Sequence, residues 1–246
     1  MIPSAAVGDE QKAVGWTALA LPIAVVATSL LLPIIPGLFA DLGYGHLSAH
    51  MAQHILTMNF IAPIVAFGLL RYGPLGRISR RNPHEPGSWL ALAVVLQIGA
   101  LWFWHAPGVF EWAMAGRLPA AFMHASLFLI ALLFWVCVLG IDGHARWKPI
   151  AALLITGKLF CLLGVLLVFA PRALYDMPFA HGYLSQAHGH SLAASTLADQ
   201  QLAGLLMVAA CPLTYIVAGV VIAARWILDL EREDPGESIL RPAAGR

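Results

Sequence analysis

Charged residues are scarce in this chain of 246 residues. Asp, Glu, Lys and Arg make up 11% of it, against roughly a quarter in an average soluble domain. Hydrophobic residues make up 60% of the chain and the mean hydropathy is +0.78. Such a composition cannot cover a compact surface with solvated groups, which argues against a soluble enzyme and against a disordered tail. A formal net charge of +1 also leaves no basic field that would attract a nucleic acid.

Cysteine is scarce as well. Cys137, Cys161 and Cys211 form no CxxC pair, so the sequence offers neither a disulfide framework nor a zinc ribbon. Internal repeats, low-complexity segments and an appended soluble domain are also lacking. We therefore expect residues 1–246 to form a single transmembrane helical domain.

Long apolar runs dominate the chain instead, and six of them are long enough to cross a bilayer. They cover approximately residues 14–39, 46–70, 88–105, 118–141, 149–170 and 200–224, and Lys158 is the only charged residue within them. The runs are too long for core strands and lack period-2 alternation, so we expect helices. These features predict an all-α integral membrane protein with a bundle of about six transmembrane helices.

Positive charges are distributed unevenly between the connections. Eleven Lys and Arg residues lie on the side of the two termini, whereas only Arg117 and Arg172 lie on the other side. Because Lys and Arg accumulate in cytoplasmic loops, we expect both termini in the cytoplasm. The first run is expected to be a retained span, since it is too long for the core of a signal peptide.

Ten histidines are unusual in so apolar a chain, and eight of them fall on the outer side of the expected bundle. His46, His50 and His54 recur at every fourth residue and are followed by Met58, which predicts one stripe along the second helix. A His pair at this spacing can bind one metal ion, and an unpaired imidazole within a membrane is costly. His124 lies at a matching depth. We interpret His50, His54 and His124 as a candidate metal site, with hydrogen bonding between helices as the alternative.

Other polar residues on the outer side extend this candidate site. His105 ends the third run beside Trp102 and Trp104, where an interfacial aromatic belt explains the motif equally well. Asp199 could be a helix N-cap, whereas Gln200 has less structural reason to lie at a membrane boundary. The outer loop, residues 171–199, could form a second metal cluster or remain solvated, and its candidate ligands are Met177, His181, His188 and His190.

Two further features lie deeper in the expected bundle. Lys158 falls near the bilayer midplane, at a depth similar to that of Asn59 and Gln97, and the three predict a polar plug across three helices. Interhelical hydrogen bonding is the preferred interpretation of this plug, with a proton or quinone contact as the alternative. Gly204 would let another helix approach closely.

The donor set indicates the class of metal. Imidazoles with nearby thioethers and few carboxylates suit copper better than magnesium, calcium or manganese, and zinc is an alternative. A b-type haem held by histidines of facing helices is another alternative, although the stacked His pair favours a small ion. The thioethers near the histidines belong to Met58, Met123 and Met177.

Taken together, these residues resemble the polytopic CtaG-like cytochrome c oxidase assembly factors over approximately residues 49–207. The resemblance rests on His50-Met-Ala-Gln-His54 with Ala62-Pro63, on Trp104-His105-x-Pro107, on His124 and on the DQQLAG segment that begins at Asp199. It implies a bacterial inner-membrane protein that is needed for an active haem–copper oxidase and is linked to copper delivery. The residues that match the family pattern are His50, His54, His105, His124, Asp199 and Gln200.

We therefore expect a copper-binding membrane protein that acts in the metallation of cytochrome c oxidase, a metallochaperone rather than an enzyme. His50, His54 and His124 would be ligands with His105 as an added ligand, and Asp199 and Gln200 would orient the imidazoles. Expected partners are the lipid bilayer, oxidase subunits and periplasmic copper chaperones.

Two alternatives remain at this point. One is a membrane-bound copper or haem oxidoreductase that uses a small outer-side substrate such as superoxide, with quinone as its partner. The other is a transporter that moves copper inward past Met58, Cys161 and Cys211, although the inner half of the chain supplies few ligands.

Overall fold

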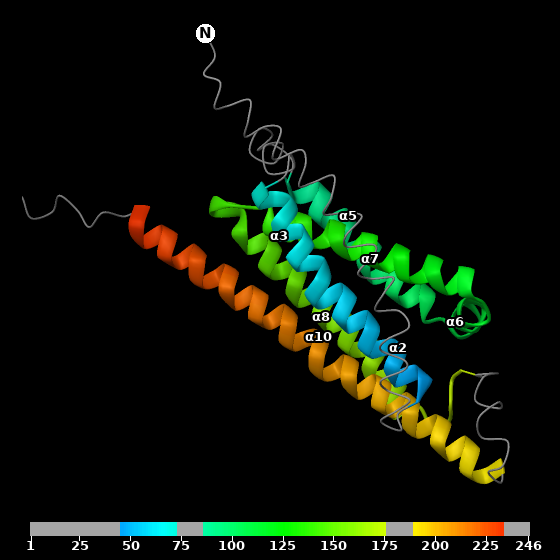
Figure 1. Ribbon diagram of the computed structural model, residues 1–246. Coiled ribbons are helices and arrows are strands. Elements are labelled where there is room, and N and C mark those ends of the chain that lie inside the picture. Colours follow the sequence, from blue (N-terminus) through cyan, green and yellow to red (C-terminus); the bar gives the residue numbers. More distant parts are fainter. Residues whose placement is uncertain (1–44, 73–85, 176–188, 234–246) are drawn as a thin grey trace, which may run out of the picture.

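The computed structural model describes residues 45–72, 86–175 and 189–233. The regular elements in this part of the chain are all helices and it contains no strand, which confirms the predicted all-α class (Figure 1). The first expected span, residues 14–39, lies outside the described residues. The elements are α2 (His46–Ile55), the π-helix η1 (Leu56–Ile61), α3 (Ala62–Tyr72), α5 (Pro86–Trp104), α6 (Pro107–Met114), α7 (Arg117–Leu139), the 3₁₀-helix η2 (Gly143–Arg146), α8 (Trp147–Phe169) and α10 (Gly189–Glu233).

Four helical segments of the described residues are long and apolar enough to cross a membrane, and a bent pair would make a fifth. The bent pair is Ser88–Trp104 with Pro107–Met114, whose axes differ by 76°. These segments cover the second to sixth apolar runs predicted from the sequence. The count of six spans and the position of the termini stay predictions. The four segments are His46–Tyr72, Arg117–Leu139, Gly143–Phe169 and Thr196–Glu231.

The surface of the described bundle is apolar and part of its interior is polar. Large apolar side chains such as Ile64, Leu118 and Phe169 are 70 to 84% exposed, as lipid-facing residues would be. Buried polar side chains lie between the helices instead, where a membrane protein places its functional and interhelical polar groups. They are Ser48, His50, Gln53, His54, Thr57, Asn59, Gln97, His105, His124, Thr156 and Gln200.

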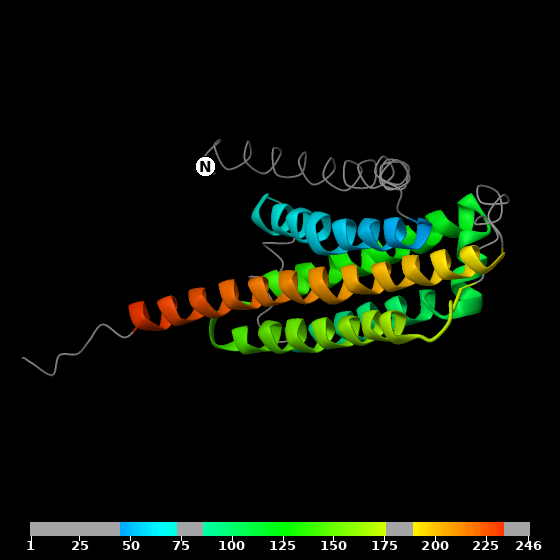
Figure 2. The ribbon, with the colours of Figure 1, turned by 90° about the horizontal axis from the view of Figure 1, so that it is seen from below.

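Helices α8 and α10 form the closest pair in the bundle and run side by side in both views (Figures 1 and 2). Gly164 and Gly204 make this contact: a Cβ at Gly164 would lie 2.9 Å from the Gly204 oxygen, and one at Gly204 would lie 2.6 Å from the Gly164 oxygen. The predicted role of Gly204 in close packing is therefore confirmed. α10 also packs against α2, while α7 packs against α3 and α5.

The helix that carries the histidine stripe is interrupted by the π-helical segment η1. Pro63 lies five residues after Met58 and has no N–H, so it cannot donate the i−5 hydrogen bond of a π-helix to the Met58 carbonyl. The indole Nε1 of Trp135 donates to that carbonyl instead, at 2.9 Å. The Thr57 hydroxyl similarly donates to the backbone oxygens of Gln53 and His54, at 2.9 and 3.2 Å.

The predicted polar plug of Lys158, Asn59 and Gln97 is wrong. Lys158 lies on the exposed face of α8, on the same side as Leu154 and Leu162, whereas Asn59 and Gln97 are buried. The helical phase of α8 turns Lys158 away from the bundle. Gln97 donates through Nε2 to the hydroxyl of Tyr215, at 3.2 Å.

Candidate metal centre

The topology brings the beginning of α2, the end of α5 and the beginning of α7 to one end of the bundle, beside α6 (Figure 1). His50 and His54 come from α2, His105 follows α5, and His124 comes from the second turn of α7. Successive spanning helices run in opposite directions, so residues at a helix start and at the preceding helix end meet. The chain thereby gathers four imidazoles from three helices.

His50, His54 and His124 form a compact triad that could hold a metal ion. One nitrogen from each ring can be chosen so that all three lie within 4.8 Å of one another. The Nε2 atoms of His50 and His54 are 2.7 Å apart, and the ring of His124 lies 5.2 Å from that of His50 and 4.8 Å from that of His54, centroid to centroid. At a metal–nitrogen distance of about 2.0 Å, side-chain shifts of about 1 Å would bring the three donors onto one ion.

His105 lies beside this triad, with its ring centroid 5.9 Å from that of His54 and 6.3 Å from that of His50. Its Nδ1 lies 2.7 Å from the Leu101 carbonyl oxygen. A carbonyl oxygen can only accept, so Nδ1 carries the proton and Nε2 keeps its lone pair. Within the described residues, Nε2 of His105 and Nδ1 of His124 are buried without a hydrogen-bond partner. Such a carbonyl contact is the one that commonly orients a metal-ligating histidine.

Aromatic side chains pack against His50 and His105. Phe110 of α6 contacts His50 edge-on at 5.1 Å and stacks on His105 at 5.9 Å, and Tyr175 packs against Phe110 at 4.5 Å, all between ring centroids. The Tyr175 hydroxyl donates to the backbone oxygen of His105 at 3.0 Å. Burial raises the pKa of Tyr175 to about 12, so the hydroxyl keeps its proton at neutral pH. The imidazoles are only 4 to 7% exposed, more enclosed than an outward-facing site would require.

The carboxylate of Asp199 binds the backbone at the start of α2. Its carboxylate accepts hydrogen bonds from the backbone N–H groups of Leu47 and Ser48, at 2.9 and 3.1 Å. These groups belong to the first turn of α2 and have no partner within that helix. Asp199 therefore caps the helix that bears His50 and His54. Gly45 makes room for it, because a Cβ there would overlap the carboxylate.

Gln200 also binds backbone groups rather than an imidazole. Its Nε2 donates to the Leu167 oxygen at 3.1 Å, and its Oε1 accepts from the Leu174 N–H at 2.7 Å. These bonds fix the end of α8 and the turn that leads to Tyr175. Asp199 and Gln200 thus stabilise the elements around the candidate centre, and their role in orienting the imidazoles stays a prediction.

The remaining sequence candidates lie apart from the triad or outside the described residues. His46 is the first residue of α2 and is exposed, so the predicted stripe begins effectively at His50. Met58 is buried and lines a cavity next to His54. His181 and His188 lie outside the described residues, as does the side chain of His190, so the second cluster stays a prediction.

Sequence reasoning missed Phe110, Tyr175 and Trp135. Tyr175 and Phe110 carry no spacing signal, because their contacts cross loops and a bent helix pair. Trp135 could have been anticipated: Pro63 within an apolar run leaves a carbonyl without a donor, and buried indole N–H groups need acceptors. Trp104, expected in an interfacial belt, is buried and donates through Nε1 to the Ser126 hydroxyl at 3.0 Å.

Comparison with known proteins agrees with the motifs. No curated protein and no solved structure is significantly similar to the chain. The family model described as "Cytochrome c oxidase caa3 assembly factor (Caa3_CtaG)" matches residues 11–229, which include every helix that bears the four histidines. The chain belongs to the cytochrome c oxidase caa3 assembly factor family.

Proposed function

We propose that this protein binds copper at His50, His54 and His124, with His105 as a further ligand, and supplies it during assembly of cytochrome c oxidase. We place it in the bacterial inner membrane with both termini in the cytoplasm and the histidines toward the periplasmic side. The copper is cargo, to be passed to an oxidase subunit or received from a periplasmic copper chaperone. The single observation that carries this proposal is the buried four-histidine cluster.

The state of the nitrogen atoms supports metal binding over interhelical hydrogen bonding. A structural histidine cluster would pair its polar atoms, because an unpaired buried polar group costs about 1–3 kcal/mol. Here two ring nitrogens, Nε2 of His105 and Nδ1 of His124, have no partner among the described residues. The short Nε2–Nε2 contact of His50 and His54 requires a shared proton, which a metal ion would replace.

The packing of the rings favours a small ion over haem. Ring centroids within the cluster are separated by 4.2 Å for His50 and His54 and by 4.8 Å for His54 and His124. A porphyrin held by facing histidines would have to separate these rings, and Phe110 already packs against His50. Among the described residues the cluster contains imidazole donors and no carboxylate, which suits copper or zinc. The neighbouring thioethers of Met51 and Met58 favour copper.

Metal analysis with an optical spectrum tests the proposal on the full chain, purified in detergent after expression with copper. We expect about one copper ion bound to the cluster and no Soret band. In His50→Ala/His54→Ala, copper should bind at least about 100-fold more weakly, which is a larger loss than substitution of residues outside the ligand set usually causes. His46→Ala is the matched control because His46 is exposed on the same helix, and it should retain the copper.

Three results would contradict the proposal. A Soret band without copper would indicate a bis-histidine cytochrome. Unchanged copper content in the double variant would remove the assignment of the ligands. Steady quinone reduction by the copper-loaded protein would favour the oxidoreductase alternative over cargo delivery.

A further inference from the structure

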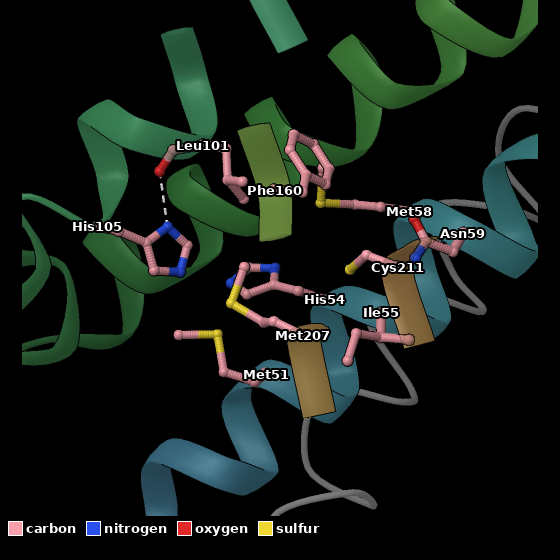
Figure 3. Close-up of a pocket in the computed structure, with 10 residues that line it drawn as sticks. All are labelled: Met51, His54, Ile55, Met58, Asn59, Leu101, His105, Phe160, Met207 and Cys211. Atoms are coloured by element: carbon pink, nitrogen blue, oxygen red, sulfur yellow. Dashed lines mark hydrogen bonds between the residues drawn. The ribbon is translucent and has the colours of Figure 1, made fainter. Parts of the chain in front are cut away.

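A small cavity adjoins the histidine cluster on its deeper side, between α2–η1 and α10 (Figure 3). Its volume is about 10 Å³, which is enough for a single small ion or water molecule. Four of its lining residues carry sulfur, namely Met51, Met58, Met207 and Cys211. We call this space the sulfur cavity. All four are 1 to 4% exposed. His54 and His105 line it as well, so the cavity and the histidine cluster share two side chains.

The sulfur donors come from two facing helices at regular helical spacing. His54 and Met58 lie four residues apart on the α2–η1 helix, and Met207 and Cys211 lie four residues apart on α10. Figure 3 shows these side chains reaching from the two helices toward the same space around the His54 ring. Methionines are flexible and normally fill gaps in a core, yet here three of them leave a small space between them.

A second feature of the cavity wall points to a ligand. Nε2 of His105 is buried and has no hydrogen-bond partner within the described residues. His105 lines the cavity. An apolar packing defect would not be expected to carry an imidazole lone pair without a partner at its edge.

We propose that the sulfur cavity is a second metal site, distinct from the histidine cluster, which takes a soft monovalent cation such as Cu(I). Thioethers and thiolates select soft ions over hard or divalent ones. A single positive charge balanced by the Cys211 thiolate leaves no net charge in an apolar environment, whereas a divalent ion would leave one uncompensated. On binding, the thiol proton is released to solvent and the metal–sulfur bond replaces the S–H bond, without any change of oxidation state.

His54 connects the two sites, because it belongs to the histidine triad and also lines the sulfur cavity. A cation can therefore move between them by exchanging one ligand at a time, without leaving protein donors. The preference for a soft cation follows from the sulfur donors, and only the naming of copper as the natural cation rests on the proposed function.

Silver(I) is the probe for this site, since it is a soft monovalent ion that needs no reductant. The full chain in chloride-free detergent is stripped of metal, titrated with silver nitrate and analysed for bound silver. Met207→Leu/Cys211→Ala should bind one silver ion fewer per chain than the unaltered protein. The matched control is Met114→Leu/Cys137→Ala, two partly buried residues that do not line the cavity, and it should bind as much as the unaltered protein.

The second arm separates this proposal from the proposed function. His50→Ala/His124→Ala leaves all four sulfur residues in place and should keep the silver ion of the sulfur cavity, while Met207→Leu/Cys211→Ala should keep the copper of the histidine cluster. Equal silver binding by the cavity variant and the unaltered protein would overturn the second site. If His50→Ala/His124→Ala and Met207→Leu/Cys211→Ala both lost the same ion, the two clusters would form one shared site. That result would also overturn the proposal of a second site.

A spectroscopic measurement on the unaltered chain does not depend on whether the variants fold. X-ray absorption of protein loaded with Cu(I) until both sites are filled should show sulfur as well as nitrogen scatterers in the first coordination shell. A shell of nitrogen alone would contradict the sulfur cavity as a site, while leaving the histidine cluster intact.

Discussion

Two groups of polar residues lie at the same end of the bundle, and the sequence motifs alone do not separate them. In the histidine cluster, ring nitrogens of His105 and His124 are buried without partners in the described part of the chain. At the start of α10, by contrast, Asp199 and Gln200 direct their side chains to backbone groups of neighbouring elements. The histidine cluster therefore retains ring nitrogens that could bind a metal ion. The side chains of Asp199 and Gln200 instead form hydrogen bonds that stabilise the fold. Binding function is therefore expected in the first group and stability in the second.

The strongest test of this difference is His124→Ala. We expect at least about 100-fold weaker copper binding, because the substitution removes a ligand and not merely a residue that hydrogen-bonds to a ligand. Thermal unfolding in detergent should change little, since the alanine removes a polar nitrogen that has no partner among the described residues. A large loss of stability with copper binding intact would reverse the roles of the two groups.

Asp199→Ala should give the opposite result. It removes the acceptor of the Leu47 and Ser48 N–H groups, and loss of such a cap costs about 1–2 kcal/mol of unfolding free energy. The melting temperature should fall, while copper binding weakens by no more than about 10-fold, the lower range for residues outside the ligand set. Asp199→Asn retains one acceptor oxygen, so its melting temperature should lie between those of the unaltered protein and Asp199→Ala. Loss of all copper in Asp199→Ala without a change in melting temperature would make Asp199 a ligand.

Tyr175→Phe sharpens the comparison, because Tyr175 belongs to the fold but contacts a candidate ligand. The variant keeps the packing on Phe110 and loses the hydrogen bond to the His105 backbone oxygen. We expect a loss of about 1 kcal/mol in stability and a small loss of copper affinity. Burial raises the pKa of Tyr175 to about 12, so the hydroxyl donates throughout the neutral range. The stability difference between the variant and the unaltered protein should therefore not change between pH 6 and pH 9, because even pH 9 is about three units below that pKa.

The smallest effect on copper binding is expected for Gln200→Glu. The substitution keeps the oxygen that accepts from the Leu174 N–H and replaces the Nε2 donor to the Leu167 oxygen. We expect destabilisation of about 1–3 kcal/mol when the introduced carboxylate is ionised, because it then faces the Leu167 oxygen without a proton to donate. The destabilisation should be smaller when the carboxyl group is protonated and donates to that oxygen. The melting temperature of Gln200→Glu should therefore rise relative to the unaltered protein as pH falls. A pH-independent difference would show that the Leu167 contact contributes little.

The sequence was sufficient to predict the helical class, five apolar runs that the structure shows as helices, and the residues of the histidine triad. Helical periodicity and the cost of burying an imidazole in a membrane are local rules, and they located His50 and His54 on one face. The partners of Asp199 and Gln200 were not predictable in this way, because they depend on which helix ends meet in space. Lys158 shows the same limit: its depth followed from counting residues, but the side of α8 on which it lies depends on how the helix packs.

The π-helical segment between the histidines and α3 has a consequence for how this protein tolerates insertions and deletions. Segment Leu56–Ile61 accommodates one residue more per turn than an α-helix would. Deleting a single residue there would restore α-helical geometry and leave α2 and α3 in nearly the same relative rotation, because the turn loses the residue that it holds in excess. The same deletion within an α-helical part of this span would rotate the residues on its two sides by about 100° relative to each other. The second deletion would change the orientation of the His50 and His54 rings relative to α3, and the first would not. Length, and not only composition, is thus part of what specifies the metal centre.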